Sequence, residues 1–185
     1  MKRAGMVLLL ALALSGCAKE NHQMNRALAL RSRVLAASRI CFQSAVTADY
    51  GDRIQSFSMD CAGSGQAELA FSMTAPEYIA GIAGTISHDR GSFRFADKTV
   101  YYGLLTDDQL SPVSAPWIFL KALAGGYIRC VGPEGELLRL TLEDTYRDSQ
   151  LQVDIWLEEE TPVRGDILCD GKRILSLEVE DFEIS

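Results

Sequence analysis

Cys17 is the residue whose surroundings most clearly indicate chemistry, because it directly follows Leu14-Ser15-Gly16. A cysteine thiol is a nucleophile once deprotonated, and small residues before it leave the backbone open to a peptidase. Upstream, Lys2 and Arg3 precede an apolar run from Met6 to Leu14. That run is far shorter than the roughly 20 residues that a membrane-spanning helix needs. The pattern predicts a signal-peptide core followed by a modified cysteine.

The segment Leu14 to Cys17 resembles a bacterial lipobox. The resemblance implies that Cys17 takes a diacylglycerol and becomes the first residue of the mature chain. We therefore expect a lipoprotein signal peptide at 1–16, a lipid-anchored start at 17–20 and a single domain at 21–185. Two or more acyl chains hold a protein stably, so the membrane is a predicted partner, at the outer face of the cytoplasmic membrane. The alternative is a plain secretory signal with a chance cysteine.

The composition argues against several other classes of protein. The formal net charge is −7, which makes nucleic acid an unfavourable partner. His22 and His88 stand alone and no two cysteines form a CxxC pair, so we expect no metal or redox site. Nucleophile-elbow, zinc-protease and nucleotide-loop signatures are missing. We expect no enzyme, no catalytic residue and no cofactor.

Four cysteines follow Cys17 and permit disulfides outside the cytoplasm. Cys41 and Cys61 lie in two alternating runs around Asp49-Tyr50-Gly51-Asp52, which predicts a hairpin. A three-residue loop at Tyr50 to Asp52 would place the two cysteines opposite each other, close enough for a disulfide. A two-residue loop would shift the pairing and remove the bond. Plain buried thiols are the alternative.

The rest of the chain predicts a mainly β domain. An amphipathic helix is expected over Asn21 to Arg39, with Met24, Leu28 and Leu35 on its apolar side beside Ala27 and Val34. Alternating strands follow, including a hairpin about Asp170-Gly171. The expected fold is a curved antiparallel sheet of about ten strands, an incomplete, half-open barrel around short helices.

One short helix is expected inside that sheet. Pro116 opens the segment Trp117 to Ala124, which carries one charge and ends at Gly125-Gly126. A helix that is apolar all round must be buried. The candidate residues for an apolar cavity under the sheet are Trp117, Phe119, Leu120, Leu123, Leu140, Val153 and Ile155. Filling of an ordinary core is the alternative. Trp156 is out of phase with its apolar neighbours, which indicates either an exposed contact surface or packing under a loop.

This order of elements is similar to that of the LolA/LolB lipoprotein-carrier superfamily. The similar stretches are Pro-Glu-Tyr-Ile-Ala-Gly-Ile from Pro76, Pro-Trp-Ile-Phe-Leu-Lys-Ala-Leu from Pro116, and the closing strands from Leu151 to Phe182. Within the superfamily the chain resembles anchored lipoproteins of single-membrane spore-formers, including the spore-germination type. The resemblance implies a half-barrel that binds a lipid or acyl chain. Alternatively it implies a lipoprotein that docks and regulates an extracytoplasmic cell-wall enzyme such as a spore-cortex amidase. A membrane anchor disfavours a soluble shuttle.

Overall fold

The computed structural model describes residues 22–64, 68–87, 90–95, 98–103, 105–106, 109–146 and 149–185. Cys17, the signal peptide at 1–16, the start at 17–20 and His88 lie outside the described residues.

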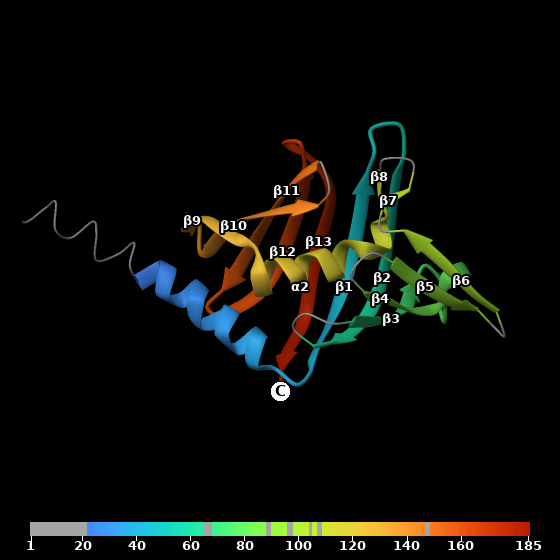
Figure 1. Cartoon of the computed structure of the whole chain (residues 1–185), viewed down its shortest axis with the longest axis horizontal. Coiled ribbons are helices and arrows are strands. Elements are labelled where there is room, and N and C mark those ends of the chain that lie inside the picture. The colour runs from blue at the N-terminus through green and yellow to red at the C-terminus, as the bar shows by residue number, and fades with distance from the viewer. Residues whose placement is uncertain are drawn as a thin grey trace, which may run out of the picture.

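One antiparallel sheet of eleven strands forms the body of the protein, in the order β6-β5-β4-β3-β2-β1-β13-β12-β11-β10-β9 (Figure 1). Its first and last strands in the chain, β1 and β13, pair at the centre of the sheet. The edge strands β6 and β9 lie at opposite ends of this order, so the sheet is not closed. The predicted mainly β, half-open architecture is confirmed, with eleven strands where about ten were expected.

The bounds of these elements follow the turn residues of the sequence. The sheet contains β1 (Ile40–Asp49), β2 (Ile54–Gly63), β3 (Glu68–Ala75), β4 (Ala83–Ser87), β5 (Arg90–Phe95), β6 (Lys98–Gly103), β9 (Tyr127–Glu134), β10 (Leu137–Tyr146), β11 (Ser149–Glu158), β12 (Thr161–Cys169) and β13 (Lys172–Ile184). Outside it lie the short ribbon of β7 (Leu105–Thr106) and β8 (Gln109–Leu110), the 3-10 turns Glu77–Ile79 and Pro112–Ser114, and the helix α2 (Ala115–Gly125).

The two faces of the sheet differ because successive side chains of a strand point to opposite sides. On β11 the alternate residues Leu151, Val153, Ile155 and Leu157 are all buried on the side of the sheet that α2 covers. We call this side the inner face and the opposite side the outer face. The hairpin predicted at Asp170-Gly171 joins β12 to β13, and both of its turn residues have positive φ, as a two-residue turn of this type requires.

The helix α2 lies against the inner face, where it contacts β10, β11, β12 and β13 (Figure 1). Pro116 occupies its first turn, and the N–H of Gly126 donates to the carbonyl of Ala122 at 2.8 Å where the helix ends. Nine of its eleven residues are buried. This confirms the prediction of a buried helix, since an apolar surface on every side of a helix must be removed from water.

The N-terminal helix, residues 22–36, packs with a different side than the sequence predicted. Ala27, Leu30 and Val34 are buried, whereas Leu28 and Leu35 are 47% and 49% exposed. The prediction placed Leu28 and Leu35 on the apolar, buried side and was wrong there. Ala27, Leu30 and Val34, at positions i, i+3 and i+7, form a narrow buried stripe that is enough to hold the helix on one neighbouring element. Leu28 and Leu35 lie outside this stripe.

The hairpin of β1 and β2 also departs from the prediction. Asp49 pairs with Ile54, so the loop holds four residues, and Cys41 pairs with Ala62 while Cys61 pairs with Phe42. Because a one-residue shift moves a side chain to the other side of a sheet, the two cysteines lie on opposite faces. The predicted disulfide between Cys41 and Cys61 is therefore wrong, and none of the four described cysteines forms a disulfide in the structure.

Candidate functional site

The residues predicted to line a cavity do come together, in the core of the protein. All seven are buried in one hydrophobic cluster that includes α2 and the inner face of the sheet. They are Trp117, Phe119, Leu120, Leu123, Leu140, Val153 and Ile155. Leu140 and Ile155 are direct partners across β10 and β11. All seven therefore belong to one core, and the cavity they were expected to line stays a prediction.

The packing around Phe119 shows how closely α2 approaches the sheet. Phe119 is fully buried, and a Cβ built on Gly165 of β12 would meet its ring at 2.7 Å. Only glycine allows an aromatic ring to lie this near the strand backbone. The ring of Phe42 lies 6.3 Å from that of Phe119, centroid to centroid. The helix thus fills the space above β12 and β1.

The two pockets described in the structure open elsewhere. The larger, of about 740 Å³, is lined mostly by outer-face residues such as Cys41, Gln43, Asp60, Ala62 and Ser72, and also by their neighbours Phe42, Cys61 and Phe71. The smaller, of about 150 Å³, adjoins it along β1, β2 and β13. None of the seven predicted cavity residues lines either pocket. The open volume of these pockets therefore lies on the side of the sheet away from α2.

The outer face of β10, β11 and β12 carries a polar arrangement centred on Trp156. Arg139, Trp156 and Arg164 are consecutive cross-strand partners. The guanidinium carbons of Arg139 and Arg164 lie 5.3 and 4.6 Å from the centroid of the Trp156 ring. Trp156 is only 6% exposed because the two guanidinium groups cover it. Such stacking over an aromatic ring is favourable for a cation.

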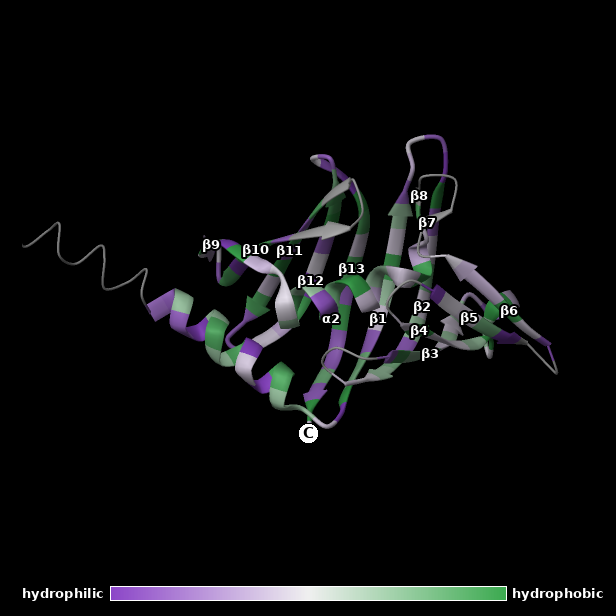
Figure 2. Ribbon diagram, in the orientation of Figure 1, coloured by the Kyte–Doolittle hydropathy of each residue, from purple (hydrophilic) through white to green (hydrophobic). Residues whose placement is uncertain are grey.

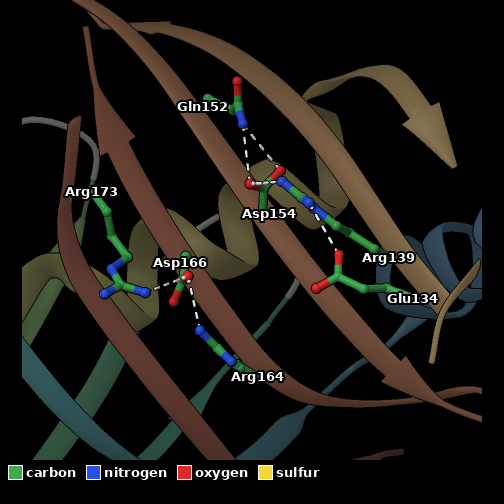
Figure 3. Close-up of polar contacts among 7 residues, drawn as sticks. All are labelled: Glu134, Arg139, Gln152, Asp154, Arg164, Asp166 and Arg173. Carbon is green, nitrogen blue, oxygen red and sulfur yellow. Dashed lines mark hydrogen bonds and ion pairs between the residues drawn. The ribbon is translucent and has the colours of Figure 1, made fainter. Parts of the chain in front are cut away.

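Two buried aspartates hold these arginines in place (Figure 3). Asp154 accepts hydrogen bonds from Arg139 at 2.6 Å and from Gln152 at 3.1 and 3.2 Å. Asp166 accepts from Arg164 at 3.1 Å and from Arg173 at 3.3 Å. We call these residues the outer-face cluster: Glu134, Arg139, Gln152, Asp154, Trp156, Arg164, Asp166 and Arg173.

The cluster balances three arginines against three carboxylates, and its exposed carboxylate, Glu134, pairs with Arg139 at 3.0 Å. The side chains of Asp154 and Asp166 are buried, whereas those of Arg139, Arg164 and Arg173 are exposed over a third or more of their area. The hydrogen bond from Arg139 to Asp154 raises the pKa of Arg139. Within the described part of the chain, Oδ1 of Asp166 has no hydrogen-bond partner. The cluster therefore consists of partly exposed guanidinium groups bonded to two buried carboxylates and to the exposed Glu134.

Sequence reasoning found only one member of this cluster. Trp156 was singled out because it breaks the alternation of β11, and one of its two predicted environments, an exposed contact surface, is wrong. It is covered by arginine side chains rather than by a loop. The missed signal was the shared phase of Arg139, Trp156 and Arg164, since cross-strand partners share a face. That signal requires the strand register, which single strands do not contain.

The arrangement is suited to recognition. In the described ranges no group of three or more His, Cys, Asp or Glu side chains is placed to hold a metal ion. The same ranges contain no helix with the length and apolarity needed to cross a bilayer. Arginine and tryptophan are the side chains most enriched among energetically dominant contacts at protein interfaces. The outer-face cluster is therefore the candidate functional site.

Comparison with known proteins supports the fold. No family model and no curated protein sequence matches the chain. Among solved structures, a DUF1329 family protein from Desulfovibrio piger is similar with a TM-score of 0.50 and 9% identity, over 90% of this chain and 93% of that one. The LolA superfamily protein NE2245 from Nitrosomonas europaea is similar with a TM-score of 0.49 and 10% identity, over 86% and 93% of the two chains.

A third similar structure is that of the CwlD amidase from Clostridioides difficile in complex with the GerS lipoprotein. It matches with a TM-score of 0.43 and 10% identity, over 84% of this chain and 91% of the other. At 9% identity, the likeness to the DUF1329 family protein indicates a similar fold and no more. The chain itself has the open antiparallel half-barrel that its sequence predicted.

Proposed function

We propose that this protein is a membrane-anchored extracytoplasmic lipoprotein that works by docking a protein partner, and that it has no catalytic activity of its own. The partner in this proposal is an extracytoplasmic cell-wall enzyme such as a spore-cortex amidase. A LolA-like fold by itself is compatible with lipid carriage and with docking. The choice between the two rests on the interior and the surface of this chain.

The interior supports docking because α2 is buried against β10, β11, β12 and β13, so in this proposal it takes the place of an acyl chain. Admitting a lipid would require displacement of the helix and exposure of the large apolar side chains Trp117, Ile118, Phe119, Leu120 and Leu123. At about 1.5–3 kcal/mol for each side chain, the cost is on the order of 10 kcal/mol. That cost is comparable to the whole stability of an ordinary domain, about 5–15 kcal/mol. The burial of α2 against the inner face is the observation that supports the proposal.

The outer-face cluster supplies a suitable docking surface. Arg139 and Arg164 present partly exposed guanidinium groups whose positions are fixed by Asp154 and Asp166. Fixed side chains lose little rotamer entropy on binding, which favours affinity. Planar guanidinium groups bind carboxylates in a bidentate manner. The partner surface in this proposal therefore carries Asp or Glu side chains.

The docking proposal is tested by titrating the purified lipoprotein with extracytoplasmic amidases from the same organism and measuring heat of binding and amidase activity. We expect a complex with one amidase and at least a tenfold weaker complex for Arg164→Ala, in line with the loss of a central interface arginine. Arg129→Ala is the matched control, because Arg129 is an exposed arginine of β9 outside the cluster. No binding, or equal loss in both variants, would contradict the proposal.

Anchoring is tested separately through Cys17. Cys17→Ala is expected to leave the protein unprocessed or released, because the thiol that would carry the lipid is gone. Membrane fractionation and the mass of the mature N-terminus measure the outcome. A variant that is cleaved normally and stays in the membrane fraction would show that the lipobox interpretation is wrong.

A further inference from the structure

The N-terminal helix has an exposed side that no part of the described chain covers. Its exposed positions include Leu28 and Leu35, which lie two helical turns apart. The exposed residues beside them on this side are small or uncharged. These exposed positions are Asn25, Leu28, Ala29, Ser32, Leu35 and Ala36. Side chains at such spacing share one broad face of a helix. That face carries no charged residue, and we call it the outward helix face.

The arginines of the same helix each bond to a group of the protein body, although Arg33 is itself exposed. Arg31 donates to the carbonyls of Leu123 and Gly126, at 2.9 and 2.7 Å, where α2 ends. Arg33 pairs with Glu160 at 3.2 Å, and Arg26 donates to the carbonyl of Glu159. The contact of Arg31 is favourable because cations at a helix C-terminus are stabilising. Together the three arginine contacts fix which side of the N-terminal helix packs on the protein. Figure 2 shows hydrophobic and hydrophilic residues interspersed along it.

The position of this helix in the sequence indicates what its outward face meets. His22, where the described helix begins, is five residues after Cys17. Five residues of fully extended chain span at most about 18 Å. If Cys17 carries acyl chains, the helix is therefore held within that distance of the bilayer surface. A second copy of the protein is a poor alternative occupant, because stable interfaces bury about 800 Å² per partner and a single short helix offers less.

We propose that the outward helix face lies on the bilayer to which Cys17 is attached, with Leu28 and Leu35 inserted at the boundary of headgroups and acyl chains. This inference rests on the proposed anchoring at Cys17. Because Arg26, Arg31 and Arg33 are already bonded to groups of the protein, binding depends on apolar contact rather than on anionic lipid. The contact of Arg31 with α2 makes helix and half-barrel one unit, so docking gives the domain a fixed orientation on the membrane.

Tryptophan substitution in the full-length lipoprotein on vesicles tests the inference. The variants Leu28→Trp and Leu35→Trp place a fluorophore on the outward helix face, and vesicles with brominated acyl chains quench only tryptophans that enter the bilayer. The native Trp117 and Trp156 are buried in the protein and give a constant background. Ile54→Trp is the control, since Ile54 is 69% exposed and the ten residues of β1 separate its turn from the helix.

We expect at least threefold stronger quenching at positions 28 and 35 than at position 54. We expect the same quenching in neutral phosphatidylcholine and in vesicles with phosphatidylglycerol, at 0.1 and 0.5 M salt. Protein that sediments with vesicles but shows equal quenching at all three positions would overturn the docking of the helix and leave the anchoring at Cys17 intact. Quenching that requires anionic lipid overturns the apolar mechanism. Protein that does not sediment with vesicles overturns both the anchoring at Cys17 and this inference.

Discussion

The two faces of the C-terminal half of the sheet are built on the same strands but on different principles. On the inner face, Leu140 and Ile155 meet α2 in a continuous apolar core. On the outer face, at the adjacent positions of the same two strands, Arg139 and Trp156 belong to a network of charges and an aromatic ring. The inner face requires only apolar side chains of suitable volume, whereas the outer face requires particular groups at particular distances. Specific geometry on an exposed face is characteristic of recognition.

Thiol labelling tests the assignment of residues to the two faces most strongly. Cys61 is buried on the inner face, and burial raises the pKa of its thiol, whereas Cys130 is exposed on β9. Labelling of Cys61 requires opening of the structure and a deprotonated thiol. With N-ethylmaleimide at pH 8, we expect Cys61 to react about 1,000-fold more slowly than Cys130, measured by mass spectrometry of quenched samples. Equal rates, or a Cys41–Cys61 disulfide in unreduced protein, would contradict the register of β1 and β2.

The inner face is tested by Phe119→Ala. Removal of this fully buried ring leaves a cavity against Gly165 and β1, and such truncations cost about 3–5 kcal/mol of unfolding free energy. Val100→Ala, at an exposed position of β6, should change stability by less than about 0.5 kcal/mol. Urea unfolding followed by circular dichroism measures both. A loss below 1 kcal/mol for Phe119→Ala would mean that α2 is loosely held and that the interior can open.

The two faces also differ in how far the sequence alone predicted them. The alternation of apolar residues in β11 was enough to predict the sheet, and the apolar side chains on all sides of α2 were enough to predict a buried helix. Together they predicted the seven residues that meet in the core. The number of residues in the β1–β2 loop was not predictable, because the polar residues from Asp49 to Asp52 suit turns of several lengths. The loop is one residue longer than predicted, and this shift in pairing places Cys41 and Cys61 on opposite faces. The outer-face cluster was missed for the same reason, since it depends on register across three strands.

Asp154→Asn tests whether the outer-face network is rigid. The substitution keeps the shape but removes the charge that accepts hydrogen bonds from Arg139 and Gln152. Hydrogen bonds to charged groups contribute about 1.5–3 kcal/mol, and we expect a loss in that range by urea unfolding. Glu143→Gln, which breaks a pair with exposed Arg129, should cost about 1 kcal/mol or less. Equal costs would mean that the cluster is an ordinary set of solvated charges.

The smallest expected effect concerns Tyr102, which stacks on Phe93 near the β6 edge of the sheet. Burial raises its pKa, and its hydroxyl has no partner among the described residues. Because the pKa is higher in the folded than in the unfolded state, this contribution to stability is fully present below about pH 10 and declines above it.

Tyr102→Phe should therefore be neutral or up to about 1 kcal/mol more stable at pH 7. It should also lose less stability than the parent protein between pH 7 and pH 11, measured by urea unfolding at both values. A destabilised variant at pH 7 would indicate that the hydroxyl has a partner that the described residues do not include.

Acyl chains are expected to stay outside the half-barrel. Their position can be measured directly with a phospholipid whose acyl chain carries a photoreactive diazirine. The full-length anchored protein is placed in vesicles that contain this lipid, irradiated and digested, and labelled peptides are mapped by mass spectrometry. We expect labelling of the N-terminal helix around Leu28 and Leu35, and none in α2 or on the inner-face residues Leu140, Val153 and Ile155. Labelling of Phe119, Leu123 or those inner-face residues would show that lipid enters the interior and would contradict the account.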